Sequence, residues 1–179
     1  MRVRPAEIED AEAIATVYVR SWRGAYPSLI PQSYLDAMRP EDTVGGVRQW
    51  LAATAWPYRG TLVLLGLPDG EADDTPVTGF AALGPSRDDD ADAGAVGEIL
   101  TIYLDPDAFG RGGGHRLLTA ALDALRLGGY TTATLWVLNT NARARRFYER
   151  HGWRADGATK LHDWEAFVAT DLRYAIDLA

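Results

Sequence analysis

The chain has 179 residues, of which 47% are hydrophobic, so its length fits a single domain that buries a core of its own. Its formal net charge of −7 disfavours nonspecific binding of nucleic acid, which relies on lysine and arginine to neutralise phosphates. The absence of cysteine excludes a disulfide, a zinc–thiolate site and a cysteine that carries an acyl group. No apolar run approaches the roughly 20 residues that cross a bilayer, and Met1 leads into charged residues rather than a signal peptide, so we expect a cytoplasmic protein without membrane contact.

The N-terminal part predicts a strand, three helices and a meander of strands. A strand over residues 2–4 precedes a helix from Asp10 to about Trp22, and Asp10 is the expected N-cap of that helix. Proline suits a first helical turn, so Pro31 and Pro40 are expected to open helices over 32–38 and 41–56. Three strands follow, with short connections that fit an antiparallel meander, over residues 61–67, 77–84 and 96–104. The acidic runs between these strands, 69–74 and 88–92, are interpreted as solvated loops.

A glycine-rich run from Asp105 to His115 follows the last of these strands. Its glycines at 110, 112, 113 and 114 allow positive φ and let the backbone approach a ligand closely. The next helix has apolar residues recurring over 117–125, and its first N–H groups and positive dipole end suit a phosphate. The run lacks the Gly-Lys-Ser/Thr ending of a P-loop and the glycine spacing of a dinucleotide fold. It therefore predicts a phosphate-carrying cofactor without a metal, and no metal-ligand spacing relates His115, His151 and His162.

The rest of the chain predicts a strand–helix–strand crossover. Gly128 and Gly129 end the helix after the glycine run, a strand is expected over 131–138, and a further helix over 141–150. A late strand over 167–176 completes a mixed α/β order. The segment from Ala158 to Glu165 is interpreted as a variable loop.

A second motif, Asn141 to Trp153, follows the strand that ends at Leu138. Together with the glycine run it resembles the GNAT acetyltransferases. Their Arg/Gln-x-x-Gly-x-Gly/Ala loop corresponds to Phe109 to Gly114, and their Asn-x-x-Ala-x-x-Phe-Tyr-Glu-x-x-Gly-Phe motif to Asn141 to Trp153. The opening Val3 to Ala6 and the run Glu98 to Leu104 resemble the family's first and fourth strands. The resemblance implies one GNAT domain over residues 1–179, of the α/β (α+β) class, with a mixed, mostly antiparallel central sheet flanked by helices.

The resemblance implies an N-acetyltransferase that moves the acetyl group of acetyl-CoA to a primary amine by direct attack in a ternary complex. The acceptor would be a small-molecule amine or a peptide N-terminus, and the negative net charge mildly favours a cationic one. The alternative is a noncatalytic acyl-CoA-binding or sensor module on the same fold. A purely structural domain is disfavoured, because the clustered glycines cost backbone entropy. The sequence leaves open which amine is the acceptor and whether the protein forms a homodimer.

Two residues are the candidate catalytic groups. The resemblance gives Glu98 the role of general base, acting directly or through water, and alternation places it on one strand face with Leu100, Ile102 and Leu104. A surface residue at the end of the strand is the alternative. Tyr148 would meet the departing sulfur of CoA, and core packing is its alternative.

The resemblance assigns CoA binding to backbone and loop residues, namely Ile102, Tyr103, Leu104, Gly110, Arg111, Gly112, Gly113, Gly114, His115 and Asn141. Asn141 also suits an N-cap, and both roles are compatible. Phe109 occupies the position where the family usually has a basic residue, which would remove one charged contact of about 1.5–3 kcal/mol. The arginines at 143, 145 and 146 are interpreted as a solvated face with an Arg145–Glu149 pair, or as a source of one contact to the 3′-phosphate.

The resemblance implies that the acceptor-lining region lies near the end of the first helix. Trp22 and Tyr26 flank Gly24 there, and aromatic side chains can stack on a substrate or cover its apolar part. Core packing explains the same residues equally well.

Overall fold

The computed structural model describes residues 1–66, 76–163 and 167–178, so the acidic run 69–74 lies outside the described residues. The strands in these ranges are β1 (Arg2–Pro5), β2 (Gly60–Leu65), β3 (Val77–Pro85), β4 (Val96–Leu104), β5 (Thr132–Leu138), β6 (Arg154–Asp163) and β7 (Val168–Asp177). The α-helices are α1 (Ala11–Ala25), α2 (Gln32–Ala37), α3 (Pro40–Ala52), α4 (Gly113–Leu127) and α5 (Ala142–Arg150). Two short 3-10 turns, Ile8–Asp10 and Pro106–Ala108, precede α1 and α4.

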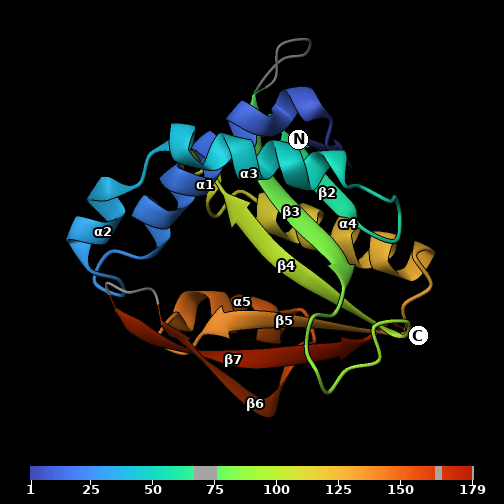
Figure 1. Cartoon of the computed structure of the whole chain (residues 1–179). Helices are drawn as coiled ribbons and strands as arrows, with labels where there is room; N and C mark the ends of the chain where they lie inside the picture. The colour runs from blue at the N-terminus through green and yellow to red at the C-terminus, as the bar shows by residue number, and fades with distance from the viewer. Residues whose placement is uncertain (67–75, 164–166, 179) are drawn as a thin grey trace.

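The strands form one sheet in the order β1-β2-β3-β4-β5-β7-β6 (Figure 1). Neighbouring strands are antiparallel except for β4 and β5, which are parallel. The meander β2-β3-β4 and the crossover β4-α4-β5 confirm the predicted organisation. The helix α4 is the connection that a parallel pair of strands requires, since the chain must return along the sheet between them. The fold is therefore the mixed, mostly antiparallel α/β class expected from the sequence.

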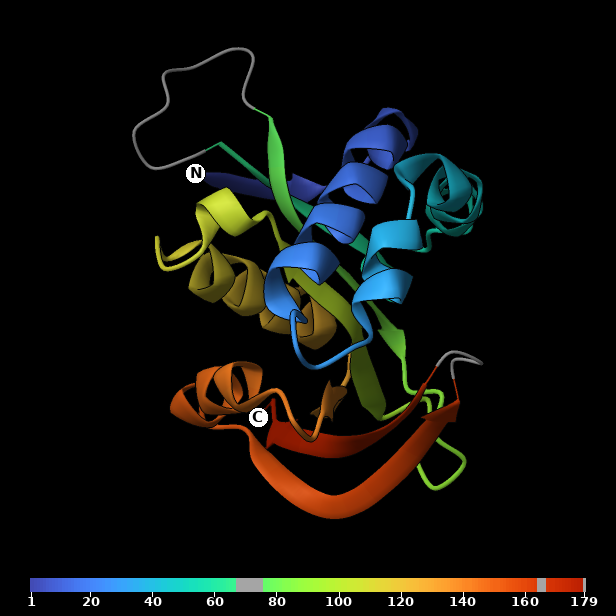
Figure 2. The ribbon, with the colours of Figure 1, turned by 90° about the vertical axis from the view of Figure 1, so that its left-hand side faces the viewer.

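Helices cover both faces of the sheet. In Figure 2, α1, α2 and α3 lie on one side of the strands β1 to β4 and α4 lies on the other. The predicted apolar face of α4 is buried against the sheet, with Leu117, Leu118, Ala121 and Leu125 each at most 1% exposed. Ile14 and Val17 of α1 belong to the cluster on the opposite face, together with Leu51 of α3. No helix in the described part of the chain is long and apolar enough to cross a bilayer.

Two segments differ most from the prediction, each for a local reason. The helix expected over 41–56 ends at Ala52, since Pro57 disfavours helical backbone at the residue before it and an isolated bridge pairs Ala55 with Arg59. The expected loop from Ala158 to Glu165 is largely strand β6, with its last two residues outside the described ranges. Among the described residues β6 pairs only with β7, and it is exposed along most of its length, so it carries no alternation of apolar residues that would predict a strand.

Asp10 turns away from the helix that it was expected to cap. Its side chain makes no cap hydrogen bond to α1. It accepts instead from Arg4 Nη1 at 2.7 Å, from Arg4 Nη2 at 2.9 Å and from the Glu7 N–H at 2.8 Å. Burial by itself raises the pKa of Asp10, but the hydrogen bonds from Arg4 and Glu7 outweigh it and leave the pKa lowered. The carboxylate thus ties β1 to the start of α1.

We predict that Asp10→Asn lowers the free energy of unfolding at neutral pH by about 1–3 kcal/mol, because Arg4 loses a charged acceptor. A lowered folded-state pKa gives a contribution that is full above the ordinary aspartate value, about 3.9, and is lost as the pH falls below it. Urea denaturation should therefore show a constant difference between wild type and variant from about pH 5 to pH 8 that narrows as the pH falls below about 3.9. A difference that persists unchanged at low pH would contradict this role of the charge.

Candidate active site

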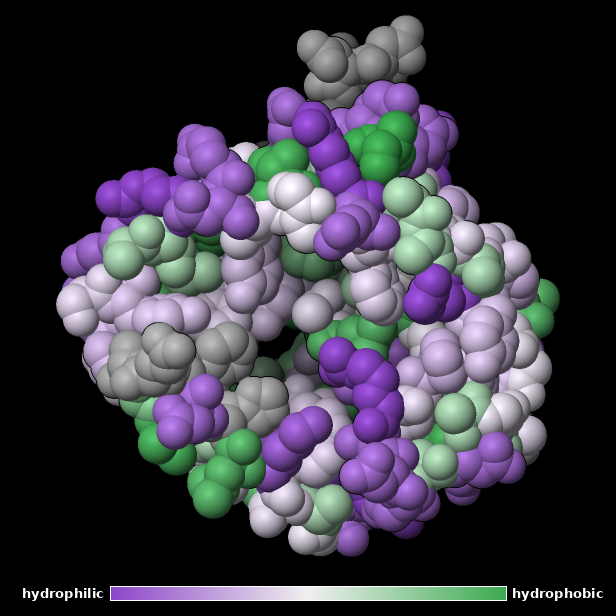
Figure 3. Space-filling model, in the orientation of Figure 1, coloured by the Kyte–Doolittle hydropathy of each residue, from purple (hydrophilic) through white to green (hydrophobic). Residues whose placement is uncertain are grey.

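The parallel strands β4 and β5 separate soon after they meet. Their pairing covers Val96 to Glu98 against Thr132 to Thr134, and no further pairing between them occurs among the described residues. A cavity of about 760 Å³ occupies the divergence, lined by β4 from Glu98 to Leu104, by β5 from Leu135 to Leu138, and by residues of α1, α5 and the glycine run. Figure 3 shows a hollow on this face, between the upper part of the molecule and the strands β5 to β7. All of the predicted site residues except Arg111 and Gly113 line this cavity.

A β-bulge sets which way Glu98 faces. Two consecutive residues of β3, Ala82 and Leu83, pair with Thr101 and Ile99 of β4. Leu100 lies between these two and has no partner in β3, so it is an extra residue in β4. The expectation that Glu98 shares a face with Leu100, Ile102 and Leu104 is therefore wrong. The β4 side chains that pack in the core under α4 are those of Ile99, Ile102 and Leu104. Glu98 lies on the opposite face, with Thr101 and Tyr103, because the bulge reverses the alternation that the sequence suggests.

Glu98 is 2% exposed, which contradicts the alternative of a surface residue at the strand end. Its Oε2 accepts from the backbone N–H of Arg87 at 3.1 Å and from Arg87 Nε at 3.3 Å, and its Oε1 accepts from Arg87 Nη2 at 3.0 Å. The Arg87 side chain is 66% exposed, so the ion pair joins a buried carboxylate to a guanidinium at the cavity wall. Arg87 was not among the predicted site residues, because it stands between a strand and an acidic run and belongs to no motif.

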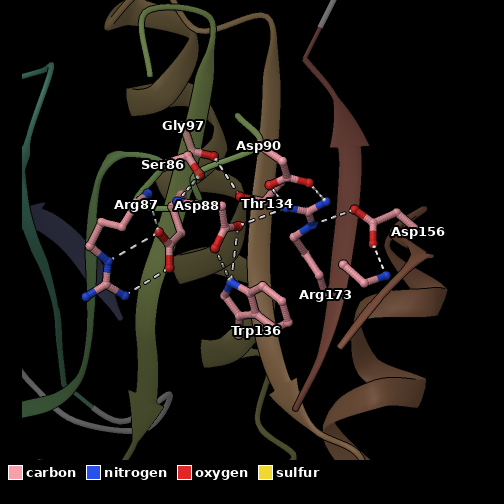
Figure 4. Close-up of polar contacts among 11 residues, drawn as sticks. Ser86, Arg87, Asp88, Asp90, Gly97, Thr134, Trp136, Asp156 and Arg173 are labelled. Carbon is pink, nitrogen blue, oxygen red and sulfur yellow. Dashed lines mark hydrogen bonds and ion pairs between the residues drawn. The ribbon is translucent and has the colours of Figure 1, made fainter. Parts of the chain in front are cut away.

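The loop that carries Arg87 is held by Arg173 of β7 (Figure 4). Arg173 contacts Asp90 at 2.6 Å, Asp156 at 2.6 Å and Asp88 at 3.1 Å. The hydrogen bond to Asp90 is the largest cause that raises the pKa of Arg173, and burial opposes it. Trp136 Nε1 also donates to Asp88 at 3.1 Å. The acidic run 88–92 lies in a loop as predicted, but its role is not simple solvation, since Asp88 and Asp90 fix that loop to β7.

Tyr148 belongs to the core, as the packing alternative expected, and it also lines the cavity. Its contact with the sulfur of CoA stays a prediction. It is 7% exposed, and its ring contacts Phe147 and Trp153 edge to face, with centroids 5.3 and 6.1 Å apart. Burial is the main cause that raises the pKa of Tyr148, and the Tyr26 phenol adds to it. The hydroxyl therefore stays protonated at neutral pH and can donate a hydrogen bond into the cavity.

The glycine run shapes the start of α4. Gly110 and Gly112 have φ values of 73° and 83°, a region that other residues adopt only with strain. Gly112 is the N-cap of α4, no side chain caps this end, and the first turn has no acidic residue. Four of the predicted loop residues line the cavity, namely Gly110, Gly112, Gly114 and His115, whereas Arg111 and Gly113 do not. The uncapped N–H groups and the helix dipole can bind an anion at this wall.

The other predicted cofactor residues lie around the same cavity. Asn141 is the N-cap of α5, where its Oδ1 accepts from the Ala144 N–H at 3.0 Å, and it also lines the cavity, as do Ile102, Tyr103 and Leu104. Arg145 donates to the Tyr174 hydroxyl at 3.2 Å, and Tyr174 donates to Glu149 at 2.8 Å, so a phenol bridges the expected Arg145–Glu149 pair. The helix α5 therefore presents its polar start to the cavity.

Trp22 and Tyr26 line the end of the cavity near α1. Their ring centroids are 5.0 Å apart, and Trp22 lies 6.4 Å from Tyr103. Trp22 is also buried in a small cluster with Ile30 and Leu35, so core packing accounts for part of its surface, and its contact with a substrate stays a prediction. Burial is the main cause that raises the pKa of Tyr26, whose hydroxyl neighbours Tyr103 and Asn141. This wall is aromatic, and the Asp171 carboxylate, which also lines the cavity, adds to the raised pKa of Tyr26.

A pair of histidines joins the two helices beside the glycine run. His115 Nδ1 lies 2.9 Å from His151 Nε2, and His151 Nδ1 lies 2.8 Å from the Phe147 carbonyl oxygen. Because a carbonyl only accepts, we infer that His151 is protonated at Nδ1 and accepts from His115 at Nε2. In the described residues, no group of three or more histidine, aspartate or glutamate side chains is arranged to hold a metal ion.

Comparisons with known proteins agree with this architecture. Residues 16–153 match the model of the acetyltransferase (GNAT) family. The uncharacterized N-acetyltransferase YuaI of Bacillus subtilis is 31% identical over 139 residues, which are 78% of this chain and 72% of the relative. An uncharacterized N-acetyltransferase of Archaeoglobus fulgidus is 31% identical over 83% of this chain and 89% of its own. The crystal structure of the PaiA N-acetyltransferase from Thermoplasma acidophilum, in complex with coenzyme A, matches 98% of both chains with a TM-score of 0.71 and 19% identity.

We predict that Gly113→Ala lowers the free energy of unfolding by about 1–3 kcal/mol, the usual effect of overpacking. A Cβ at this position would lie 2.8 Å from Leu64 Cδ2 and 3.0 Å from Leu104 Cδ2, so either these leucine side chains or the start of α4 would have to shift. Gly45→Ala is the matched control, because its Cβ would meet nothing within 4 Å and alanine favours the helix α3 by roughly 0.5–1 kcal/mol. Denaturant unfolding of both variants measures the difference, and equal effects would contradict the close packing of α4.

Proposed function

The chain belongs to the acetyltransferase (GNAT) family and is an N-acetyltransferase, and we propose that it transfers the acetyl group of acetyl-CoA to a primary amine by direct attack in a ternary complex. One observation carries the proposal: a single cavity is lined by the glycine run, by Glu98 and by Tyr148. The anion-binding helix end and the two candidate catalytic groups therefore open to the same space. We propose that residues 1–179 act as one catalytic domain of a cytoplasmic enzyme.

The residues around the cavity fit acetyl-CoA. The uncapped start of α4 offers N–H donors and a positive dipole end to the pyrophosphate, with no acidic side chain in the first turn to oppose it. Beyond Glu98 the edge of β4 that faces β5 has no strand partner among the described residues, which leaves backbone groups of Ile102, Tyr103 and Leu104 for the pantetheine arm. Asn141 lies where this arm would pass between β4 and α5.

We assign the amine proton to Glu98 through a bridging water. Oε2 already accepts two hydrogen bonds from Arg87 and Oε1 accepts one, so a lone pair of Oε1 is the free acceptor. Thr101 lines the same cavity on the same strand face, and its buried hydroxyl has no hydrogen-bond partner among the described residues, so it suits a second contact to this water. The deprotonated amine then attacks the thioester carbonyl carbon, forming the C–N bond.

Tyr148 serves the leaving group in this proposal. As the C–S bond breaks, the electron pair goes to the sulfur of CoA, and the Tyr148 hydroxyl donates a hydrogen bond or its proton to that sulfur. The raised pKa of Tyr148 keeps the donor protonated through neutral and mildly alkaline pH. Since a noncatalytic CoA-binding module needs neither Glu98 nor Tyr148 at the cavity, their placement favours catalysis.

The acceptor is proposed to be a small-molecule amine or a peptide N-terminus that enters beside Trp22 and Tyr26. The direct experiment measures CoA release from acetyl-CoA over a panel of amines, amino acids and short peptides. We expect release that depends on one class of amine. CoA binding without release for any acceptor would support the noncatalytic module instead.

We predict that Glu98→Gln lowers kcat about 10²- to 10⁴-fold near neutral pH, the usual contribution of a general base. Glutamine keeps the side-chain length and an acceptor for the Arg87 N–H, so the Michaelis constant for acetyl-CoA should change little. The pH profile of kcat should lose its dependence on this base. Retained activity with an unchanged pH profile would return Glu98 to a structural role with Arg87.

We predict that Tyr148→Phe also lowers kcat, and that its effect shrinks for acyl donors whose leaving thiol is more acidic, because such thiols need less help to depart. Steady-state kinetics with a series of acyl thioesters measures the trend. An effect that does not vary with the leaving thiol would mean that Tyr148 acts by packing alone.

A further inference from the structure

Phe109 and Arg143 form a contact that joins the glycine run to α5. The Arg143 Cζ lies 4.1 Å from the centroid of the Phe109 ring, within the range of a cation–π interaction. Phe109 directly follows the 3-10 turn Pro106–Ala108, Arg143 is the second residue of α5, and both line the cavity. The side chains therefore meet at the wall where the uncapped start of α4 opens.

The guanidinium of Arg143 makes no other contact of this kind, and no hydrogen bond or ion pair, in the described part of the chain. Arg145, two residues further on, donates to Tyr174 and to Asn139. Arg143 forms no hydrogen bond or ion pair with any described residue, although 25 aspartates and glutamates make the chain strongly acidic. Arg146 and Arg150, at i+3 and i+7 from Arg143, line the same cavity. A stripe of cations along an acidic protein's cavity points to an anionic ligand.

Stacking leaves the donors of Arg143 available. A guanidinium is planar, and contact of its face with an aromatic ring leaves the N–H groups at its edge free to bind two phosphate oxygens at once. Phe109 stands where the related loop motif usually has a basic residue. The ring can therefore replace that residue indirectly, since it holds a cation from another helix at the same wall.

We propose that Phe109 seats Arg143 so that its guanidinium binds the pyrophosphate of CoA together with the N–H groups at the start of α4. The inference rests on the proposed function, because it presumes CoA as the ligand. Phe109 is then a positioning residue that acts through Arg143. The loop lacks its own basic side chain at Phe109, and Arg143 of α5 supplies the positive charge in its place.

Calorimetric titration of CoA, dephospho-CoA and pantetheine into four proteins tests the proposal: wild type, Arg143→Gln, Phe109→Leu and the double variant. We expect Arg143→Gln to weaken CoA binding about 10- to 100-fold, the size of a lost charged hydrogen bond, and Phe109→Leu about 2- to 5-fold. In the double variant Phe109→Leu should add nothing further, because its partner is gone. Dephospho-CoA should show the same losses, whereas pantetheine, which lacks the pyrophosphate, should bind all four proteins equally.

Two controls keep the test specific. Arg116→Gln removes the same charge from the exposed side of α4, outside the cavity lining, and should leave CoA binding nearly unchanged. Arg143→Lys keeps the charge without the planar fork and should bind CoA with intermediate strength. The proposal is overturned if Phe109→Leu weakens CoA binding equally with and without Arg143, or if pantetheine loses as much as CoA. Absence of CoA binding to the wild type would overturn the proposed function as well, whereas wild-type binding with unaffected Arg143→Gln overturns this inference alone.

Discussion

The separation of β4 from β5 is the constraint on which the rest of the site depends. The two strands pair over only three residues each, and beyond Thr134 β5 continues with β7 as far as Leu138. The sheet is thus continuous at one end and split at the other, and the cavity occupies the split. The helices that follow β4 and β5 both begin at this end, so the N-termini of α4 and α5 reach the same space (Figures 1 and 2). A parallel pair that stayed joined would have no room for a ligand between these helices.

The charges around the split are arranged at the border between core and solvent. Glu98 is buried, but its partner Arg87 is largely exposed. Solvent screens the guanidinium, and burial of the carboxylate costs solvation energy, so the ion pair adds little to the free energy of unfolding. Its value is positional, because Arg87 lies on a loop that Arg173 fixes to β7 through Asp88 and Asp90. In the proposed reaction this arrangement holds a carboxylate beside the acceptor while leaving one lone pair free.

Local patterns predicted the parts of the fold that depend on local physics. Periodic leucines identified α4, the apolar run Val96 to Leu104 gave the bounds of β4, and the glycine run located the start of α4. The bulge at Leu100 was missed, since a count of alternating residues cannot register an insertion that only the partner strand reveals. The partnerships of Glu98 with Arg87 and of Phe109 with Arg143 were missed for a related reason. Each joins segments by tertiary packing, and neither leaves a mark in the spacing of its own segment.

We propose that acetyl-CoA lies in the split between β4 and β5, with its pyrophosphate at the start of α4 and its thioester between Glu98 and Tyr148. A crystal structure of the protein with CoA bound tests it most directly. We expect pyrophosphate oxygens within hydrogen-bond distance of the N–H groups of the glycine run, and the sulfur within reach of the Tyr148 hydroxyl. CoA bound outside the split, or with its sulfur remote from Tyr148, would show that the proposed site is wrong.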